Sequence, residues 1–304
     1  MYKKPVQRRV IRSQNREKSR YSGLFLKIIL SILLLSSVFI FVKLNTKYWN
    51  GNDKLGFAFV KTDGNIGVVE LDPKLSEMTT FTIAGETQVD VARNYGTLRL
   101  KNVWQLSQNE KLGGALLPET ITQNLFFPIT LWSSSDLSDI YKFIFSPGKT
   151  NIPFGDRLSI GIFALKVGDL NKTEIDLAKS QFLHKEKLND GLLGYTIMTQ
   201  EIIQRLSVYF SDNEIADRNF KVYITDATGQ AGVAQLVGQI IEVLGGKIVS
   251  IDRKQDVGDF DCQILGSDSN FNKKIATLFS CSIISGKTNF DLEVRLGARF
   301  AKRF

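Results

Sequence analysis

The sequence predicts an α/β protein with an N-terminal transmembrane helix, a larger mixed α/β ectodomain and a small α/β domain at the C-terminal end. Three observations support this prediction. An apolar run at 24–42 follows a strongly basic N-terminus, strand-like and helix-like periods alternate after it, and a charged break at 212–219 separates two such regions. Of the 304 residues, 43% are hydrophobic and 23% are charged, which is typical of a chain that folds mostly into globular domains.

The basic residues concentrate directly before the apolar run. Residues 1–20 contain eight Lys or Arg and one Glu, so they carry +7 of the formal net charge of +8. At about 1.5 Å per helical residue, the run 24–42 matches the hydrocarbon core of a bilayer. Lys27 interrupts the run, but its long side chain can reach the membrane surface. A cleaved signal peptide would need a small-residue cleavage site, which Phe39–Lys43 does not offer.

The charge bias also predicts the orientation of the chain. Positively charged flanks stay in the cytoplasm, so 1–23 is expected to be a cytoplasmic tail and everything after about residue 43 to lie outside. We therefore expect a single-pass protein of the cell membrane whose tail contacts membrane lipid. Because the rest of the chain is nearly neutral, the pI of about 9.3 is not evidence for a nucleic-acid partner. A DNA-binding regulator would need the folded part inside the cell.

The chain after the apolar run divides by composition. A polar segment carries Tyr48 and Trp49 at the height expected for an aromatic belt at the membrane surface. The expected segments are a stalk (43–55), a first α/β domain (56–212), a linker (213–219) and a second α/β domain (220–304).

Local patterns assign elements within these domains. Two short apolar runs, 56–62 and 65–71, flank Asp63-Gly64 and predict a β-hairpin. The β pattern continues through 78–92, and Pro118 limits where a helix at 112–125 can begin. The other expected elements are a strand at 156–168, a helix at 190–210, strands at 220–226, 247–252, 260–266 and 290–297, and helices at 231–244 and 270–279.

A strand, a glycine turn and a helix near residue 229 raise the possibility of nucleotide binding. A dinucleotide fingerprint needs three glycines, whereas only Gly229 and Gly232 are present, with Asp252 where a ribose-binding acid would lie. Alternatively, Gly229 takes a positive φ in a tight turn, and Asp226 or Thr228 satisfies free amides at the helix start. The pattern favours the turn, and no cofactor is expected.

The second domain resembles the LytR C-terminal domain. In that family the first strand ends in Asn-x-Thr-Gly, so Asp226 stands in for the asparagine. Arg299 occupies a position that is acidic in the family's closing motif. The resemblance covers about 220–300 and implies a binding or scaffolding domain without a catalytic role. The matching segments are DATG (226–229), AGVA (231–234), GG (245–246) and FDLEVRLGARF (290–300).

The first domain resembles the catalytic domain of the LytR-CpsA-Psr family, whose members are anchored by one N-terminal helix. The resemblance fades after about Trp132. It implies a Mg²⁺-dependent phosphotransferase that attaches glycopolymers from polyprenyl diphosphate carriers to the cell wall. The matching segments are VVELDPK (68–74), TIAGETQV (82–89), YGTLR (95–99) and GG (113–114).

The chain departs from this family where the chemistry would occur. Its Pro-Arg-Asp motif is Ala84-Gly85-Glu86 here, so the guanidinium is missing and the carboxylate is one methylene longer. Arg93 and Arg99 are the candidate replacement cations, and Asp63 and Glu86 are the candidate catalytic and metal-binding carboxylates. Diphosphate transfer depends on such cations, and losing one can cost on the order of a hundredfold in rate.

These departures favour a non-catalytic binding or assembly module of the cell envelope. Its expected partners are membrane lipid and a wall glycan, a polyprenyl-linked carrier or another envelope protein. The alternative is an active transferase that uses Arg93 or Arg99 with Asp63, Glu86 and Mg²⁺.

Other chemistries find little support. His184 is the one histidine of the chain, so a multi-histidine zinc site is excluded, and its charged surroundings suggest a solvated helix residue. No G-x-S-x-G nucleophile elbow occurs. Cys262 and Cys281 could form a disulfide worth around 3 kcal/mol or could be two buried thiols, and the sequence leaves both possibilities open.

Overall fold

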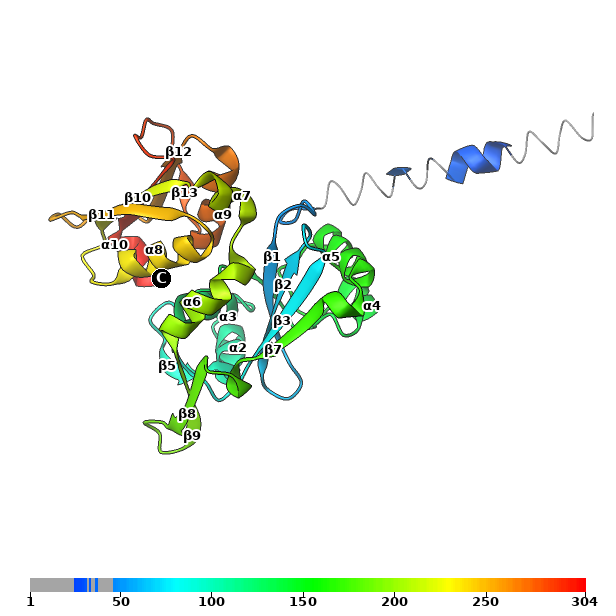
Figure 1. The fold of residues 1–304 in the computed structure, drawn as a ribbon, viewed down its shortest axis with the longest axis horizontal. Helices are drawn as coiled ribbons and strands as arrows, with labels where there is room; N and C mark the ends of the chain where they lie inside the picture. Colours follow the sequence, from blue (N-terminus) through cyan, green and yellow to red (C-terminus); the bar gives the residue numbers. More distant parts are fainter. Residues whose placement is uncertain (1–24, 32, 34–35, 38–45) are drawn as a thin grey trace, which may run out of the picture.

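The computed structural model describes residues 25–31, 33, 36–37 and 46–304. Among these residues no helix is both long and apolar enough to cross a membrane. The basic tail and much of the span expected at 24–42 lie outside the described residues. From residue 46 onward the chain folds into two lobes that lie side by side (Figure 1).

The first lobe is organised around a five-stranded mixed sheet. Its strands are Leu55–Val60 (β1), Ile66–Asp72 (β2), Glu77–Ile83 (β3), Leu131–Ser133 (β6) and Lys172–Asp176 (β7). They are ordered β6-β1-β2-β3-β7, with an antiparallel meander of β1 to β3 and a parallel strand at each edge. The predicted hairpin is confirmed, because Gly64 takes a φ of 83° in the turn between β1 and β2.

Helices cover both faces of this sheet. They are Leu100–Asn109 (α2), Leu116–Leu125 (α3), Ile140–Phe145 (α4), Phe154–Lys166 (α5) and Thr199–Phe210 (α6). Successive residues of β2 point to opposite faces: Val68 packs with residues of α2, α3 and α6, whereas Val69 and Leu71 pack with residues of α4 and α5. Every residue of β2 is buried, so the sheet forms the centre of the lobe.

Two short antiparallel hairpins complete the first lobe, and the first of them contacts α2 and α3. The first consists of Gln88–Val91 (β4) and Gly96–Arg99 (β5), and the second of Leu183–Lys187 (β8) and Leu193–Ile197 (β9). Two 3-10 turns, Asp169–Asn171 (η1) and Leu177–Lys179 (η2), flank β7. A bridge between Thr87 and Tyr195 brings the two hairpins together although they are far apart in sequence.

The second lobe contains another five-stranded sheet. Its elements are Lys221–Ala227 (β10), Val233–Val243 (α8), Lys247–Arg253 (β11), Cys262–Gly266 (β12), Ser269–Phe279 (α9), Ser282–Ile283 (β13), Leu292–Gly297 (β14) and Ala298–Arg303 (α10). The strand order is β11-β10-β14-β12-β13, parallel except for the β12–β14 pair. The six strands and helices expected here are confirmed within a few residues, whereas β13 and α10 were not predicted.

The two lobes share one hydrophobic core. Buried residues of α3, α6 and α8 belong to a single cluster, and α8 contacts both α3 and α6. The segment expected as a linker forms a short helix, α7 (Asn213–Arg218), which begins after Asp212. The Asp212 carboxylate accepts hydrogen bonds from the first turn of α7 and pairs with Lys274 of α9. The junction is therefore packed and charge-paired.

The two cysteines are joined by a disulfide, with their Cα atoms 4.7 Å apart and 19 residues of sequence separation. A loop of that length gives about 3 kcal/mol in the chain-entropy model. We expect the Cys262→Ala/Cys281→Ala double variant to lose about this much unfolding free energy in urea titrations. A reducing agent should lower the wild-type stability to that of the variant and leave the variant unchanged. A wild-type urea unfolding midpoint that does not change when the reductant is added would contradict this stabilisation.

The prediction of a strand at 156–168 is wrong, because these residues form most of α5. Pro153 directly precedes the helix with a φ of −59°, a value that suits a helix start. Ile160 and Ala164, four positions apart, are both buried on one helical face. By itself the short apolar run fits both the strand period and the helical period. Packing against the sheet favours the helix.

The prediction of a continuous helix at 190–210 is wrong in its first part. Gly191 takes a φ of 80° in the turn between β8 and β9, and α6 begins only at Thr199. The Tyr-Thr-Ile sequence of β9 is rich in residues that favour strands. His184 is exposed, but it lies on β8 and not on a helix as expected.

The expectation that Trp49 lies in an aromatic belt is also wrong. Trp49 is 4% exposed, and its ring meets Phe163 of α5 edge-on with the centroids 5.4 Å apart. Three consecutive backbone N–H groups, those of residues 47–49, donate to the carboxylate of Asp156 in the first turn of α5. The end of the expected stalk is therefore fixed to the first lobe.

Candidate functional site

The structure brings two of the four candidate residues, Glu86 and Arg99, into direct contact. Glu86 lies in a tight turn between β3 and β4, in which the N–H of Thr87 donates to the carbonyl of Ala84. Arg99 ends β5, and its partner in the β4–β5 register is Gln88. The hairpin pairing therefore places Arg99 beside the turn that carries Glu86.

Four hydrogen bonds engage the guanidinium of Arg99. Its Nη1 donates to Glu86 Oε2 at 2.5 Å and to the carbonyl of Leu193 at 3.0 Å. Its Nη2 and Nε donate to Asp190 Oδ2 at 2.6 Å and 3.1 Å. The side chain is 11% exposed, and the hydrogen bonds that it donates to Asp190 and Glu86 raise the pKa of Arg99. Two carboxylates thus offset this cation before any ligand arrives.

Glu86 is also engaged on both of its oxygens. Lys101, at the start of α2, pairs with Oε1 while Arg99 pairs with Oε2. Hydrogen bonds from Lys101 and Arg99 lower the pKa of Glu86. We call these three residues and Asp190 the Glu86–Arg99 cluster; its two cations and two anions sum to zero. The cluster offers neither the excess positive charge that grips a diphosphate nor an unpaired carboxylate for a metal ion.

Close backbone packing explains the glycine at the position of the family's arginine. The N–H of Gly85 donates to Asn65 Oδ1 at 2.9 Å. A Cβ atom on Gly85 would lie 2.2 Å from the carbonyl oxygen of Gly64. Any side chain at residue 85 would push the β1–β2 turn away, so an arginine does not fit there.

Asp63 lies in that β1–β2 turn and serves it structurally. Its carboxylate accepts from the backbone N–H and the side-chain amide of Asn65, both at 2.9 Å. The backbone hydrogen bond from Asn65 is the main cause that lowers the pKa of Asp63. In the part of the chain that the structure describes, no three His, Cys, Asp or Glu side chains gather as a metal site. As the structure stands, the carboxylates of Asp63 and Glu86 are occupied by protein partners, and neither is open to a Mg²⁺ ion.

Arg93 does not join the cluster. It lies at the tip of the β4–β5 hairpin with a φ of 64°, at the opposite end from Arg99. Its Nε and Nη2 donate to the two oxygens of Glu119 on α3 at 2.7 Å and 2.6 Å. This hydrogen-bonded pair raises the pKa of Arg93. Arg93 thus fixes the hairpin tip to α3.

The glycine segment before α8 takes the conformation of a tight turn. Gly229 and Gly232 have φ values of 72° and 89°. The Asp226 carboxylate accepts from the N–H and the hydroxyl of Thr228 at 3.1 Å and 2.6 Å, so it stabilises the turn. The expectation that Asp226 or Thr228 satisfies free amides at the helix start is wrong, because α8 has no side-chain cap and the Thr228 hydroxyl accepts from the N–H of Gln230 before the helix. Asp252 already accepts a tyrosine hydroxyl at 2.9 Å.

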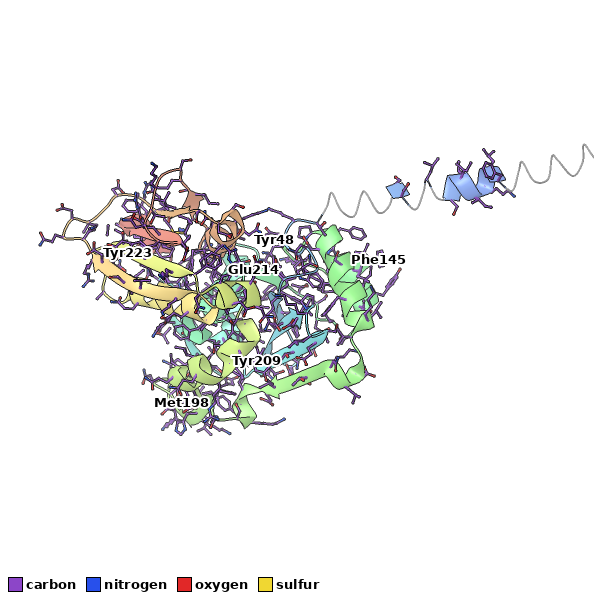
Figure 2. The ribbon with its side chains drawn as sticks, turned by 45° about the horizontal axis from the view of Figure 1, so that its top comes forward. Tyr48, Phe145, Met198, Tyr209, Glu214 and Tyr223 are labelled. Carbon is purple, nitrogen blue, oxygen red and sulfur yellow. A yellow bond between two sulfur atoms is a disulfide. The ribbon has the colours of Figure 1, made fainter. Side chains whose placement is uncertain are left out.

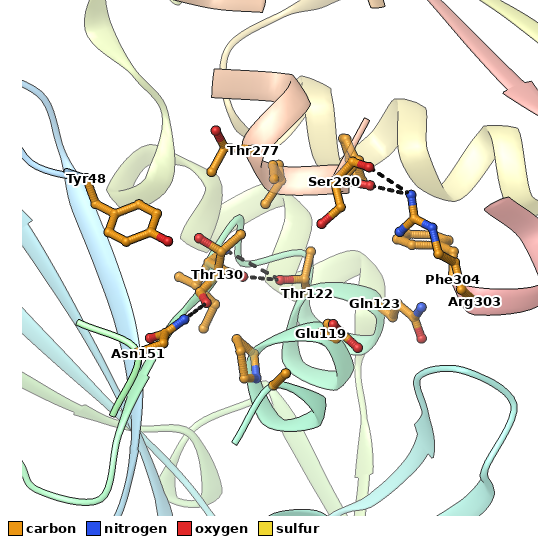
Figure 3. A pocket seen from close by; sticks show the side chains of 15 residues that line it. Tyr48, Glu119, Thr122, Gln123, Thr130, Asn151, Thr277, Ser280, Arg303 and Phe304 are labelled. Atoms are coloured by element: carbon orange, nitrogen blue, oxygen red, sulfur yellow. Dashed lines mark hydrogen bonds between the residues drawn. The ribbon is translucent and has the colours of Figure 1, made fainter. Parts of the chain in front are cut away.

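A cleft lies between the lobes next to the docked stalk. Two neighbouring cavities of about 460 Å³ and 220 Å³ share Tyr48, Thr130, Thr277 and Leu278 in their walls, and together we call them the interlobe cleft. Figure 3 shows Tyr48 and Thr130 of the first lobe on one side, and Thr277 and Ser280 of the second lobe on the other.

The chemistry of the interlobe cleft is mixed. Neutral hydrogen-bonding groups and aromatic rings dominate its smaller part, including Gln123 and Phe304. Three of its cations are paired: Lys54 with Asp72, Lys274 with Asp212, and Arg303 with a carboxylate of Asp261. Neither cavity is lined by a member of the Glu86–Arg99 cluster.

Sequence reasoning missed Asp190 and Lys101, which complete the cluster. Asp190-Gly191 is a turn signal that predicts a hairpin tip. No local pattern indicates that this hairpin folds back onto β5, because the contact spans the long sequence separation between residues 99 and 190. The candidates were therefore identified as separate charges, and their mutual neutralisation depends on the tertiary fold.

Comparison of the sequence with protein families finds no match, and comparison with curated proteins finds none either. The chain is similar to solved structures of LytR-CPS2A-psr family proteins. TagT of B. subtilis is 12% identical with a TM-score of 0.32, and the match covers 52% of this chain and 90% of TagT. The regulator yvhJ of Bacillus subtilis is 12% identical with a TM-score of 0.37, covering 50% and 94%. Lin1025 of Listeria innocua is 7% identical with a TM-score of 0.38, covering 52% and 98%.

One of the similar structures is TagT with a bound octaprenyl pyrophosphate lipid. TM-scores and identities in this range transfer neither an activity nor a binding residue to the present chain. The fold is that of a two-lobed mixed α/β protein. Its Glu86–Arg99 cluster, which contains two of the candidate residues, is internally paired and carries no net charge.

Proposed function

We propose that this chain is a membrane-anchored cell-envelope protein that binds a ligand or assembly partner and does not transfer phosphoryl groups. The Glu86–Arg99 cluster carries the proposal. Phosphoryl transfer relies on fixed cations that offset the charge of the diphosphate. In the cluster both cations are already paired with carboxylates, and Gly85 leaves no room for the motif's arginine.

The anchoring part of the proposal rests on the sequence. The basic tail (1–23) and the apolar run (24–42) favour a single span with the folded part outside the cytoplasm. The disulfide between β12 and the segment after α9 supports an oxidising location. The motifs shared with the LytR-CpsA-Psr family support a role in the cell envelope with lipid-linked or wall glycans as partners.

We place the ligand site of this binding module in the interlobe cleft. Ligand sites commonly lie at domain junctions, where two surfaces form a concave space. Hydroxyl and amide groups next to aromatic rings suit the uncharged hydroxyls and the apolar ring faces of a glycan. Gln123 and Thr277 would provide hydrogen bonds, and Tyr48 would provide a ring.

Diphosphate binding separates a binding module from a transferase. We expect the full chain in lipid nanodiscs to show no Mg²⁺-dependent heat of binding for farnesyl diphosphate in calorimetry. The Asp190→Asn variant removes one partner of Arg99, so it should gain measurable binding, which shows that the assay can detect it. Arg205→Ala, at an exposed ion pair on α6, is the matched control and should behave as the wild type. Mg²⁺-dependent binding by the wild type that Arg99→Ala abolishes would overturn the proposal.

A Mg²⁺-dependent glycopolymer transferase is the second candidate function. One observation favours it: Glu86 and Arg99 lie in contact, and Asn65 links the Asp63 turn to Gly85. In that function Glu86 and Asp63 would hold the metal and Arg99 the diphosphate, after the present ion pairs had opened. Ligation of a glycopolymer to wall acceptor by the wild-type protein, lost in Arg99→Ala, would establish it.

A further inference from the structure

An exposed apolar surface lies on α4 and α5 of the first lobe. Tyr141, Phe145 and Leu165 are 74%, 57% and 68% exposed. The rings of Tyr141 and Phe145 are 4.9 Å apart, and those of Phe145 and Phe154 are 6.1 Å apart, so three rings form a row. We call this row, together with Ile162 and Leu165, the α4–α5 patch. Clustered apolar exposure of this kind marks an interaction surface.

The α4–α5 patch adjoins the point where the N-terminal segment joins the lobe. Phe154 begins α5, and Asp156 two residues later holds the backbone of residues 47–49. Figure 2 shows Phe145 on the side of the lobe towards the described N-terminal helical residues. Lys47 is five positions after the expected end of the span, Val42, and an extended chain covers at most about 3.5 Å per residue. The lobe is therefore held within about 20 Å of the span.

Basic groups border the patch. Lys142 on α4 and Lys166 on α5 are exposed, and the guanidinium of Arg157 lies 5.7 Å from the ring centroid of Phe154. Nε and Nη1 of Arg157 are buried and have no hydrogen-bond partner among the described residues, so Arg157 packs beneath the rings and Lys142 and Lys166 are the cations exposed to solvent. The nearby Asp139 is engaged as the N-cap of α4, where it accepts from a backbone N–H. Aromatic rings flanked by cations complement the boundary between acyl chains and anionic headgroups.

We propose that the α4–α5 patch rests on the outer surface of the membrane that anchors the chain. The rings of Tyr141 and Phe145 insert at the headgroup level beside the half-buried ring of Phe154, and the exposed Lys142 and Lys166 contact lipid phosphates. This inference rests on the anchoring part of the proposed function and is independent of whether the chain transfers phosphoryl groups. It also places the interlobe cleft near the lipid surface, because Tyr48 lines that cleft and lies in the same docked segment.

Depth-dependent quenching in vesicles tests this orientation. Both native cysteines are in the disulfide, so single cysteines introduced by Tyr141→Cys or Leu165→Cys can be labelled selectively with a fluorophore. Val249→Cys is the matched control, because Val249 is 49% exposed on β11 of the second lobe. The full chain is reconstituted into vesicles of phosphatidylcholine and phosphatidylglycerol that contain headgroup-spin-labelled lipid.

We expect several-fold stronger quenching at residues 141 and 165 than at residue 249. Adding Phe145→Ser and Phe154→Ser to the Leu165→Cys chain should reduce the quenching at residue 165. Vesicles of phosphatidylcholine alone should weaken it, since the cations lose their anionic partners. Equal quenching at all three positions in protein that floats with the vesicles would overturn the inference. Failure to float would instead contradict the anchoring itself, so the two failures are distinguishable.

Discussion

Replacing Glu70 by glutamine is expected to raise the free energy of unfolding by about 3 kcal/mol at pH 7 and by about 5 kcal/mol above pH 8. Glu70 lies in β2 and is 3% exposed, and its Oε1 has no hydrogen-bond partner among the described residues. Burial raises the pKa of Glu70 from 4.5 to about 8. Lys54 lowers this pKa, whereas Asp72 and Glu77 raise it further. Glutamine has the same shape and carries no charge to desolvate.

The sign of the effect follows from proton binding. Because the pKa of Glu70 is higher in the folded than in the unfolded protein, the folded protein holds an extra proton between pH 4.5 and about 8. The stability that depends on this proton is fully present below pH 4.5 and is lost as the pH rises through about 8. The Glu70→Gln variant lacks this loss, so its advantage over the wild type grows with pH.

Urea unfolding at a series of pH values, followed by tryptophan fluorescence, measures the difference. Glu186→Gln is the matched control, because Glu186 also lies on a strand, β8, but is exposed. The Glu186→Gln curve should run parallel to the wild-type curve. A Glu70→Gln curve that also stays parallel from acid to alkaline pH would show that Glu70 does not hold the extra proton.

The second large effect is expected at Asp156, where Asp156→Asn should cost about 3 kcal/mol of unfolding free energy. The carboxylate is fully buried, and both of its oxygens accept backbone N–H groups. Oδ2 accepts from Lys47 at 3.0 Å, and Oδ1 accepts from Trp49 at 2.9 Å. An asparagine places an NH₂ group against one of these donors and removes the charge that strengthens the remaining bonds. The variant should therefore release the docked segment.

Two measurements check this prediction. Urea unfolding gives the loss of free energy, and limited proteolysis within residues 46–53 should become faster when the segment detaches. Asp139→Asn is the matched control, because Asp139 caps α4 through one N–H at 2.9 Å and asparagine is an equally good cap. Its stability should stay within about 0.5 kcal/mol of the wild type. Unchanged proteolysis in Asp156→Asn would contradict a holding role for this carboxylate.

The docked segment connects these predictions with the membrane inference. Trp49 is buried against α5, and the residues before it lead towards the expected span. A lobe on a free tether would sample all orientations, whereas one fixed at residues 47–49 presents a defined face to the bilayer. Asp156→Asn should therefore also reduce the lipid quenching at residue 165.

Much of the fold could be predicted because the elements of the second lobe carry complete local signals. The helix α8 has apolar residues at helical spacing and Gly245-Gly246 after its end, and both flanking strands are short and carry β-branched residues. In the first lobe the sequence-based prediction was wrong at α5, because a short apolar run fits both the helical and the strand period. The prediction was also wrong at β9, because this hairpin strand directly precedes a helix and was assigned to that helix. In both places packing against the sheet or the neighbouring hairpin decided the outcome.

By itself the sequence determined the charge asymmetry of the N-terminus, the apolar run, the missing motif arginine and the hairpin turn at Asp63-Gly64. These properties depend on residues that are close together in the chain. Only the tertiary structure decided that Asp190 neutralises Arg99, that Asp156 holds the segment before β1, and that Glu70 is buried without a full set of partners. Each of these is a long-range contact or a burial, and the free energy of a charge depends on what surrounds it and not on its neighbours in sequence.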